Sequence, residues 1–538
     1  MTKQTIFPIL LATSLLLQGC GNSSSGDALN IIEDNYRTTY EIFVYSFADS
    51  NNDGIGDLQG IINQLDYIND GDDATDSDLG CNGLWLTPVC PSTTYHKYDI
   101  YDYTSIDEEF GTLEDYEALI KACHERHMTV TFDFVMNHTS SEHPWFKEAT
   151  SYLASLPEDA TAEDFDESVC PYVNYYNFSK EAKEGYEKLE NCNWYYEARF
   201  WKGMPDVNLD NEAVRNEFFE IAKFWMDEGV DNFRLDAVTS YYTGNPEKNI
   251  EVLTWLNNAI KSYKEDAYIV GECWSSQSEY ASYYESNIDS FFDFAFADKD
   301  GIIAQCAKGS IPASSFGKAL EKEEALYASY NEDYVNAPFY TNHDINRSAG
   351  YYSGENVQAK IKFAGGLNMI MSGNAYLYYG EEIGMKGSGS DENKRAPMQW
   401  TADESAEYMC DGPENMDDVE MLYGTLEEQE GDSDSIYNYY KAAIRLRNTY
   451  PVIARGTTSY LGDCNTEGLC VLSKSSNEYE GVTIVVNNTD SELSGDISEY
   501  IQADASISYE LLANNPEEHA SLNHGTITIP SYGIIIVK

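Results

Sequence analysis

Residues 231–236 are Asp-Asn-Phe-Arg-Leu-Asp, a short apolar strand candidate that ends in a carboxylate. Residues 268–272, Tyr-Ile-Val-Gly-Glu, repeat this arrangement, and strands of this kind alternate with amphipathic helices from about residue 36 to 450. Repeated strand–helix units with apolar strands indicate a parallel sheet, and this many units indicate a closed barrel. The strand candidates are 41–46, 83–87, 129–135, 232–235, 268–271 and 375–379, and the helical stretches include 113–127 and 211–228.

These units predict an α/β fold, a (β/α)8 TIM barrel formed by residues 36–138 and 207–450. Residues 139–206, after the third strand, are too long for a simple loop and predict an inserted domain that forms one wall of a cleft. From residue 451 the pattern changes to short alternating strands, which predict a C-terminal β-sandwich over 451–538.

The composition limits the class of partner. Apolar residues make up 42% of the 538 residues, enough for a sizeable core, and 92 acidic against 33 basic residues give a net charge of −59. Nucleic acid and an anionic membrane surface would both be repelled by this charge, so neither is expected as a partner. A neutral carbohydrate is compatible with it, and a monomer is expected.

The first twenty residues have the features of an export signal. Residues 6–17 are mostly apolar but too short to span a bilayer. The ending Leu-Gln-Gly-Cys at 17–20 resembles a bacterial lipobox, in which Cys20 becomes the lipidated first residue, and residues 21–35 would be a flexible tether. A lipoprotein at the bacterial cell surface or in the periplasm is therefore expected, held to the membrane only through its anchor. Because Gln18 is less usual in a lipobox, a plain signal peptide is the alternative.

Ten cysteines remain besides Cys20. Export permits disulfides, and three pairs are close enough in sequence to close small loops. None has the spacing of a zinc site, so they are interpreted either as disulfides or as buried thiols. The three pairs are Cys170 with Cys192, Cys464 with Cys470, and Cys81 with Cys90.

Three acids follow predicted strands: Asp236, Glu272 and Asp344, which ends Tyr-Thr-Asn-His-Asp at 340–344. Strand C-termini carry the chemistry in such barrels. Glycosidic bond cleavage requires one carboxylate at the anomeric carbon and a second carboxyl that protonates the leaving oxygen. Arg234 lies two residues before Asp236, on the same side of the strand, and favours its ionised form. Glu272 must be partly protonated to act as an acid, so a less solvated place is expected for it.

Several short motifs then occur in order along the chain, and through them it resembles the α-amylase family, glycoside hydrolase family 13, over roughly residues 36 to 450. One such motif alone would be weak evidence, whereas the ordered set is specific. The motifs are Asp-Phe-Val-Met-Asn-His at 133–138, Phe-Arg-Leu-Asp at 233–236, Gly-Glu at 271–272, Thr-Asn-His-Asp at 341–344, Met-Pro-Asp-Val-Asn at 204–208, Tyr-His-Lys-Tyr-Asp at 95–99 and Tyr-Tyr-Gly-Glu-Glu at 378–382.

The resemblance implies a role for each residue of the site. Asp236 would be the nucleophile, Glu272 the acid/base, and Asp344 the residue that grips and distorts the sugar at the cleavage subsite. Among the substrate-binding residues, Tyr98 would stack under that sugar, His138 and His343 would hydrogen-bond its hydroxyls, Arg234 would orient the nucleophile, and Asp99 and Arg395 would hold a terminal glucose in exo-acting relatives.

A candidate metal loop spans residues 49–57, Asp-Ser-Asn-Asn-Asp-Gly-Ile-Gly-Asp. Oxygen side chains at alternate positions with one backbone carbonyl suit Ca²⁺, whereas no zinc or redox metal fits. It is not a complete EF-hand, because Gly60 stands where the bidentate glutamate would be, and a plain Asx-rich turn is the alternative. In the family this loop commonly holds calcium. The expected ligands are Asp49, Asn51, Asp53, Asp57 and the carbonyl of Ile55.

The pattern departs from many α-amylases after the nucleophile. Thr239-Ser240 replaces a Lys-His pair, which leaves open the product-side contacts and a second calcium near Asn137 and Asp206. Met204–Asn208 and the stretch 394–400 resemble the branch between amylases and oligo-1,6-glucosidases, in which Ala237 accompanies α-1,4 linkages.

The expected function is retaining, endo-acting hydrolysis of α-1,4-glucosidic bonds in starch, glycogen or maltooligosaccharides. The alternatives are an exo-acting α-glucosidase or oligo-1,6-glucosidase and a maltodextrin glucanotransferase. A carbohydrate-binding protein on a barrel without activity is the alternative from another class. It is disfavoured because all three acids are present.

Overall fold

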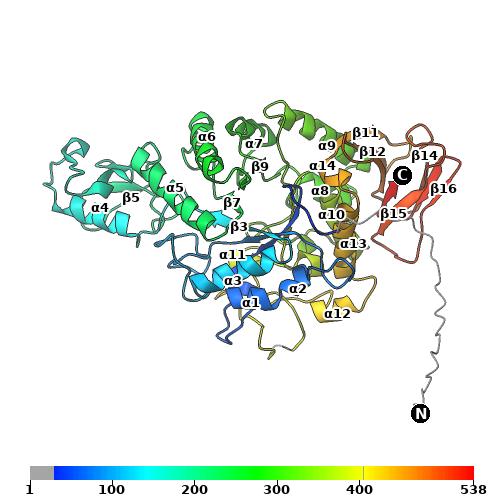
Figure 1. Ribbon diagram of the computed structural model, residues 1–538, viewed down its shortest axis with the longest axis horizontal. Helices are drawn as coiled ribbons and strands as arrows, with labels where there is room; N and C mark the ends of the chain where they lie inside the picture. The colour runs from blue at the N-terminus through cyan, green and yellow to red at the C-terminus, as the bar shows by residue number, and fades with distance from the viewer. Residues whose placement is uncertain (1–28, 404) are drawn as a thin grey trace, which may run out of the picture.

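The structure is a computed structural model that describes residues 29–403 and 405–538. Its centre is a parallel sheet of seven strands (Figure 1). The predicted signal peptide, Cys20 and most of the predicted tether lie outside the described residues. In sheet order the strands are β10 (Ala375–Tyr378), β1 (Thr38–Ile42), β2 (Gly83–Leu86), β3 (Thr129–Phe134), β7 (Asn232–Leu235), β8 (Tyr268–Gly271) and β9 (Ser290–Phe291).

Residues 336–338 close this sheet into the (β/α)8 TIM barrel. Ala337 pairs in parallel with Phe292, just after β9. On the other side, the N–H of Tyr376 in β10 donates to the Pro338 carbonyl at 2.8 Å. Because Pro338 has no N–H to donate, this eighth position is held by isolated bonds instead of a regular ladder.

Helices connect the strands and cover the outside of the barrel. Helix α3 starts with a capping box in which Thr112 and Asp115 bond each other's backbone. It ends at His124, three residues before the predicted end, and His127 has a left-handed φ of 58° that a helix cannot contain. The helices outside the inserted segment are α1 (Leu58–Asn63), α2 (Leu65–Ile68), α3 (Leu113–His124), α5 (Glu212–Asp227), α6 (Pro246–Tyr263), α7 (Gln277–Ser282), α8 (Ile302–Ala307), α9 (Ala313–Ala328), α10 (Val357–Met369), α11 (Asp391–Lys394), α12 (Leu426–Glu430), α13 (Ile436–Thr449) and α14 (Val452–Arg455).

The first strand differs from its prediction. It was expected over 41–46, but β1 covers Thr38–Ile42 and a 3₁₀ turn follows over Val44–Ser46. The N–H of Ser46 donates to the Phe43 carbonyl at 3.1 Å, so the chain turns as it leaves the barrel. A run of apolar residues does not reveal such a turn, because both conformations bury the same side chains.

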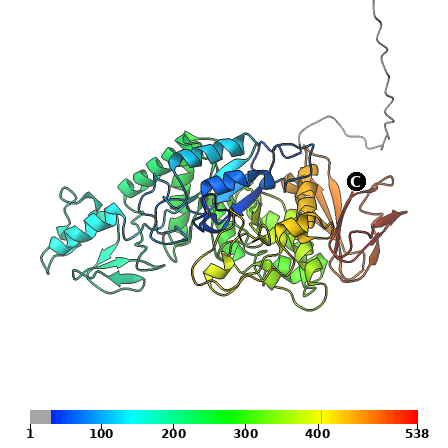
Figure 2. The same ribbon diagram turned by 90° about the horizontal axis from the view of Figure 1, so that it is seen from below.

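The segment between β3 and α5 projects from one side of the barrel, on the side opposite the C-terminal strands (Figures 1 and 2). It has a small apolar core of its own, which includes Leu153, Val173 and Trp194. An isolated bridge between His138 and Asp206 joins its two ends. Its elements are α4 (Pro144–Ser155), β4 (Phe178–Ser179), β5 (Tyr186–Lys188) and β6 (Tyr195–Glu197).

The C-terminal strands form two antiparallel sheets with a shared apolar core, a β-sandwich. Val485 and Ile535 of the larger sheet contact the same cluster as Ile527 and Ile529 of the smaller one. The larger sheet has the order β11 (Thr457–Gly462), β12 (Leu469–Ser475), β13 (Val482–Asn487), β18 (Gly533–Val537), β15 (Ile507–Leu512), and the smaller β14 (Leu493–Asp496), β17 (Thr526–Ile529), β16 (Ser521–Asn523).

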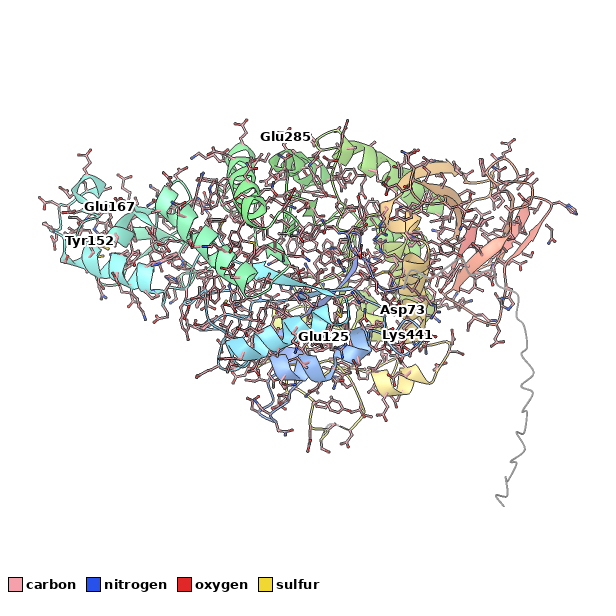
Figure 3. The ribbon with its side chains drawn as sticks, in the orientation of Figure 1. Asp73, Glu125, Tyr152, Glu167, Glu285 and Lys441 are labelled. Atoms are coloured by element: carbon pink, nitrogen blue, oxygen red, sulfur yellow. The ribbon has the colours of Figure 1, made fainter. Side chains whose placement is uncertain are left out.

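The cysteines, the loop 70–78 and the helices complete the description of the fold. The ten cysteines of the described chain are free thiols, eight of them buried, so none of the three candidate disulfides is formed in this structure. The acidic loop 70–78 lies beside α13, where Lys441 donates to the Asp76 carbonyl at 2.6 Å; Figure 3 labels Lys441 and the nearby Asp73. No helix within the described residues is long and apolar enough to cross a bilayer.

Candidate active site

Two of the predicted acids directly follow the last residues of two neighbouring strands, and those two residues are paired. Leu235 at the end of β7 pairs with Gly271 at the end of β8. The N–H of Glu272 donates to the Leu235 carbonyl at 2.9 Å, and the N–H of Asp236 donates to the Phe134 carbonyl of β3 at 3.2 Å. Parallel register therefore places Asp236 and Glu272 side by side at the C-terminal end of the barrel.

The guanidinium of Arg234 joins these two acids. It is fully buried, and its Nη1 donates to Asp236 Oδ1 at 2.9 Å and to Asp133 Oδ1 at 2.7 Å. Its Nη2 donates to Glu272 Oε2. One cation thus contacts three carboxylates, which can remain buried only because their charge is compensated.

Burial raises the pKa of two of the three carboxyl groups that contact Arg234, Glu272 and Asp133. Burial raises the pKa of Glu272 to about 7; the charges of Asp236 and Asp344 add to this rise, and Arg234 opposes it. Burial likewise raises the pKa of Asp133 to about 6 against the pull of Arg234. Glu272 is therefore partly protonated near neutral pH, as a proton donor requires.

Arg395 and His343 contact the Asp344 carboxylate. Arg395 Nη2 donates to Asp344 Oδ1 at 2.8 Å, and His343 Nε2 lies 3.3 Å from Oδ2. Burial favours a higher pKa for Asp344, but the charges of His343 and Arg395 outweigh it and hold the pKa at about 2. The side chain is still 30% exposed, so an ionised carboxylate faces the solvent side of the site.

His343 is fixed from both sides. Its Nδ1 lies 2.7 Å from Glu41 Oε1, its Nε2 lies 2.7 Å from the Tyr98 hydroxyl, and its ring stacks on Tyr98 at 5.5 Å between centroids. The Tyr98 hydroxyl also donates to Asp133 Oδ2 at 3.0 Å. Tyr98 and His343 therefore lie in the same hydrogen-bond network as Arg234 and the acids.

Three members of this network were missed as site residues: Glu41, Tyr95 and Asp133. Glu41 is fully buried in β1, and an acid between Tyr40 and Ile42 in an apolar strand is a signal that could have been noticed. Tyr95 accepts a hydrogen bond from Arg395 Nη1 at 2.9 Å. Asp133 lies in a quoted motif, but its contact with Arg234 depends on strand register.

The remaining predicted substrate-binding residues lie at the edge of this network. His138 is buried, with Nε2 3.2 Å from the Tyr98 carbonyl and its ring 5.4 Å from that of Phe200. The Asp99 carboxylate accepts hydrogen bonds from Ser92, Thr93 and Thr94. Within the described chain Asp99 makes no ion pair with Arg395, which pairs with Asp344 and Asp391.

The loop 49–57 is held by hydrogen bonds from its backbone N–H groups to its own side-chain oxygens. Asp49 accepts from the N–H groups of Asn51, Asn52 and Gly54, at 2.7–2.8 Å, while Asp57 caps α1. With about four acceptor positions on each carboxylate, the aspartates keep free positions for a cation. The donor chemistry thus fits Ca²⁺. Among residues 29–403 and 405–538, however, no three His, Cys, Asp or Glu side chains are grouped as a metal site.

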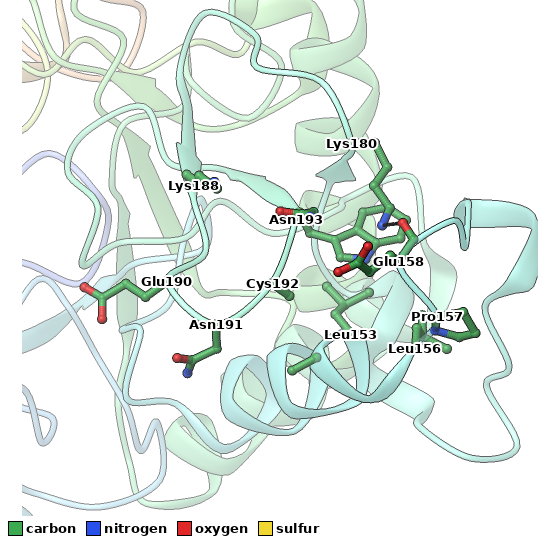
Figure 4. Close-up of a pocket in the computed structure, with 12 residues that line it drawn as sticks. Leu153, Leu156, Pro157, Glu158, Lys180, Lys188, Glu190, Asn191, Cys192 and Asn193 are labelled. Carbon is green, nitrogen blue, oxygen red and sulfur yellow. Dashed lines mark hydrogen bonds between the residues drawn. The ribbon is translucent and has the colours of Figure 1, made fainter.

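A surface hollow of about 360 Å³ lies in the projecting segment, between α4 and the residues around β5 (Figure 4). Charged and amide side chains line it, including Lys188, Glu190 and Asn193. None of Asp236, Glu272 and Asp344 lines it. The hollow is therefore separate from the candidate active site.

Comparisons with known proteins agree on one family. The family described as "Alpha amylase, catalytic domain" matches residues 41–456. Alpha-amylase 3 of Dictyoglomus thermophilum is 38% identical over 421 residues, which cover 78% of this chain and 78% of that protein. Probable oligo-1,6-glucosidase 3 of Bacillus subtilis is 30% identical over 78% of this chain and 84% of that protein. Among solved structures, Eubacterium rectale Amy13B has 48% identity and a TM-score of 0.90 over 95% of this chain and 96% of its own.

The network predicts a specific stability defect for Arg234→Met. Removal of the cation leaves three buried carboxylates uncompensated, and we expect a loss of about 3–5 kcal/mol in the free energy of unfolding at pH 7. Arg234 lowers the raised pKa values of Glu272 and Asp133, so without it these two values rise further above their unfolded values. The folded variant therefore gains protons as pH falls, and the deficit shrinks toward pH 5.

Denaturant unfolding at both pH values measures this. Arg126→Met is the matched control, because Arg126 pairs with Asp66, which is 72% exposed, and should cost under about 1 kcal/mol. An Arg234→Met deficit as small as that of the control would contradict the role of Arg234 in charge compensation.

Proposed function

Because the chain belongs to the α-amylase family of glycoside hydrolases, we propose that it hydrolyses α-1,4-glucosidic bonds within glucan chains and retains the anomeric configuration. The observation that carries the proposal is the pair Asp236 and Glu272 on one buried guanidinium, with the pKa of Glu272 raised by burial to about 7. One ionised and one protonated carboxyl are what a retaining mechanism requires.

In the proposed mechanism, Asp236 attacks the anomeric carbon and forms a covalent glycosyl-enzyme. Glu272 donates its proton to the leaving oxygen, then removes a proton from the water that attacks the intermediate. Arg234 orients Asp236 through its hydrogen bond at 2.9 Å. Asp344, held ionised by His343 and Arg395, binds hydroxyls of the sugar at the cleavage point.

Exposed aromatic rings support a longer glucan as substrate. Trp274, two residues after Glu272, is 53% exposed and stacks on Phe294 at 5.1 Å between centroids. Phe200, 52% exposed, lies beside His138. Aromatic faces pack against the apolar faces of sugars, so exposed rings beside residues of the site favour contacts beyond the cleaved bond. An exo-acting α-glucosidase or oligo-1,6-glucosidase and a maltodextrin glucanotransferase are the alternatives within the family.

The products formed from soluble starch test this choice. We expect mixed maltooligosaccharides early in the digestion, because internal bonds are cut. Glucose as the sole early product would instead indicate an exo-acting α-glucosidase. Products longer than maltotriose formed from maltotriose would indicate a transferase. A chromatogram taken at low conversion distinguishes the three outcomes.

Substitution of the two acids tests the mechanism. Asp236→Asn and Glu272→Gln should each leave a folded protein whose kcat/KM falls by at least about 10³-fold, because each removes one half of a two-carboxyl mechanism. In the wild type, NMR of fresh product should show the α-anomer first. Near-normal turnover in either variant, or the β-anomer first, would refute the assignment.

The pH profile should report the raised pKa of Glu272. The acid/base must be protonated to act on the glycosidic oxygen, and its pKa of about 7 means that the protonated fraction falls as pH rises through 7. We therefore expect kcat/KM to decline with an apparent pKa of about 7 on the basic limb, with circular dichroism unchanged over that range. A limb near pH 4.3, the value of an unperturbed glutamate, would contradict the burial argument.

We also propose that the loop 49–57 binds Ca²⁺ through Asp49, Asn51, Asp53, Asp57 and the Ile55 carbonyl. A ligand bound only by the folded state raises its stability by mass action, so chelation should lower the melting temperature. In Asp53→Ala this dependence should vanish, since the remaining ligand set is smaller. An unchanged wild-type melting temperature after chelation, with no calcium in the purified protein, would refute the site.

Export and anchoring through Cys20 complete the proposal. It rests on the sequence of residues 1–20, which lie outside the described residues. Several acyl chains on one cysteine attach a protein stably to a bilayer, whereas a single chain does so only marginally. The mass of the mature N-terminus tests it, and an unmodified cysteine or cleavage elsewhere would indicate a freely secreted enzyme.

A further inference from the structure

The turn that carries Tyr95 and Tyr98 into the site spans residues 92–99. Its base is closed by an antiparallel bridge between Ser92 and Ile100. Lys97 has a left-handed φ of 62°, and its buried Nζ lies 2.9 Å from Asp107 Oδ2. A left-handed lysine is unfavourable by itself, so this ion pair and other contacts must hold the turn.

Asp99, the last residue of the turn, has no exposed surface. Its Oδ1 accepts from the hydroxyls of Ser92 and Thr94, and its Oδ2 accepts from the hydroxyl and the N–H of Thr93. A carboxylate has about four acceptor positions, and all four are therefore taken by the turn itself. Burial opposes ionisation of Asp99, but the bonds from these three residues lower its pKa below the ordinary value.

Arg395 is engaged elsewhere. Its Nε donates to the His343 carbonyl at 3.2 Å, its Nη1 to Tyr95 and its Nη2 to Asp344. These three bonds use three of the five N–H groups of Arg395. Asp99, whose acceptor positions are all filled, is not available, as placed here, to bind the free hydroxyls of a terminal glucose. An internal glucose unit has no such free end to bind.

We propose that Ser92, Thr93 and Thr94 determine whether the site binds a terminal or an internal glucose unit. Their hydroxyls donate hydrogen bonds that fill the acceptor positions of the Asp99 carboxylate, so Asp99 positions the turn and does not bind a terminal sugar. This rests on the proposed hydrolysis of α-glucan and concerns which part of the glucan the site accepts. Asp99 is a positioning residue, because it acts through the turn that presents Tyr98 to His343.

The test compares activity on p-nitrophenyl α-glucoside, a single terminal glucose, with activity on starch. Thr93→Val combined with Thr94→Val removes two donors with little change of shape and frees two acceptor positions on Asp99. We expect the ratio of kcat/KM for the glucoside to that for starch to rise at least about tenfold, since hydrogen bonds to a charged group are among the stronger ones. Adding Asp99→Ala to this double variant should abolish the rise.

Matched controls separate this effect from a general disturbance. Thr93→Ser keeps the hydroxyl and should keep the wild-type ratio. Thr104→Val removes a hydroxyl bonded to Asp102 on an exposed loop and should also leave the ratio unchanged. Asp99→Ala alone should lower kcat/KM for both substrates together, because a mispositioned Tyr98 affects every sugar at the cleaved bond.

Two results would overturn the inference: an unchanged ratio in a folded double Val variant, or a selective loss of glucoside activity in Asp99→Ala. The second would show that Asp99 binds the terminal sugar directly. If the double Val variant does not fold, Asp99→Ala alone still distinguishes the two roles. A wild-type protein that cuts no α-glucan would instead refute the proposed function.

Discussion

The burial of Arg234 between three carboxylates is the constraint on which the site depends. Two requirements conflict at this end of the barrel. Catalytic acids must be shielded from water to acquire shifted pKa values, but a buried charge without a partner destabilises the fold. A single guanidinium satisfies both, because its planar fork donates to Asp133, Asp236 and Glu272 from two nitrogens. A lysine could not bridge them in this geometry, since its charge is concentrated on one atom.

The same cation does not make the acids alike. Burial and the charges of Asp236 and Asp344 raise the pKa of Glu272 to about 7, while Asp344 is held at about 2 by His343 and Arg395 despite its burial. Two carboxyl groups at the same end of the barrel thus differ in protonation at neutral pH: Asp344 is ionised, whereas Glu272 is partly protonated. The difference comes from their neighbours and not from their residue type, which is why one barrel end can hold both an acid and an anion.

The ends of β7 and β8 were predictable from the sequence, because apolar strands and the acids that follow them are local patterns. The predicted bounds of β7 and β8 match the structure, and the place of Asp236 and Glu272 follows from them. Contacts between distant strands were not predictable: Glu41 meets His343, 302 residues later, only because β1 and the 340–344 segment share one barrel end. The closing segment 336–338 was also missed, since Pro338 breaks the pattern that marks a strand.

A carboxylate can accept a hydrogen bond from a sugar hydroxyl only if the fold leaves one of its acceptor positions free. Within the described chain, Oδ2 of Asp236 and Oε1 of Glu272 have no hydrogen-bond partner, because Arg234 takes only the other oxygen of each. Asp99 belongs to the same set of family motifs, yet its four positions are filled by its own turn. A sequence motif shows which residue is present, but a ligand can bond only to the lone pairs that the fold leaves free. Two chains with the same motif can therefore differ in the sugar they accept, if the residues before the aspartate differ in their hydroxyl groups.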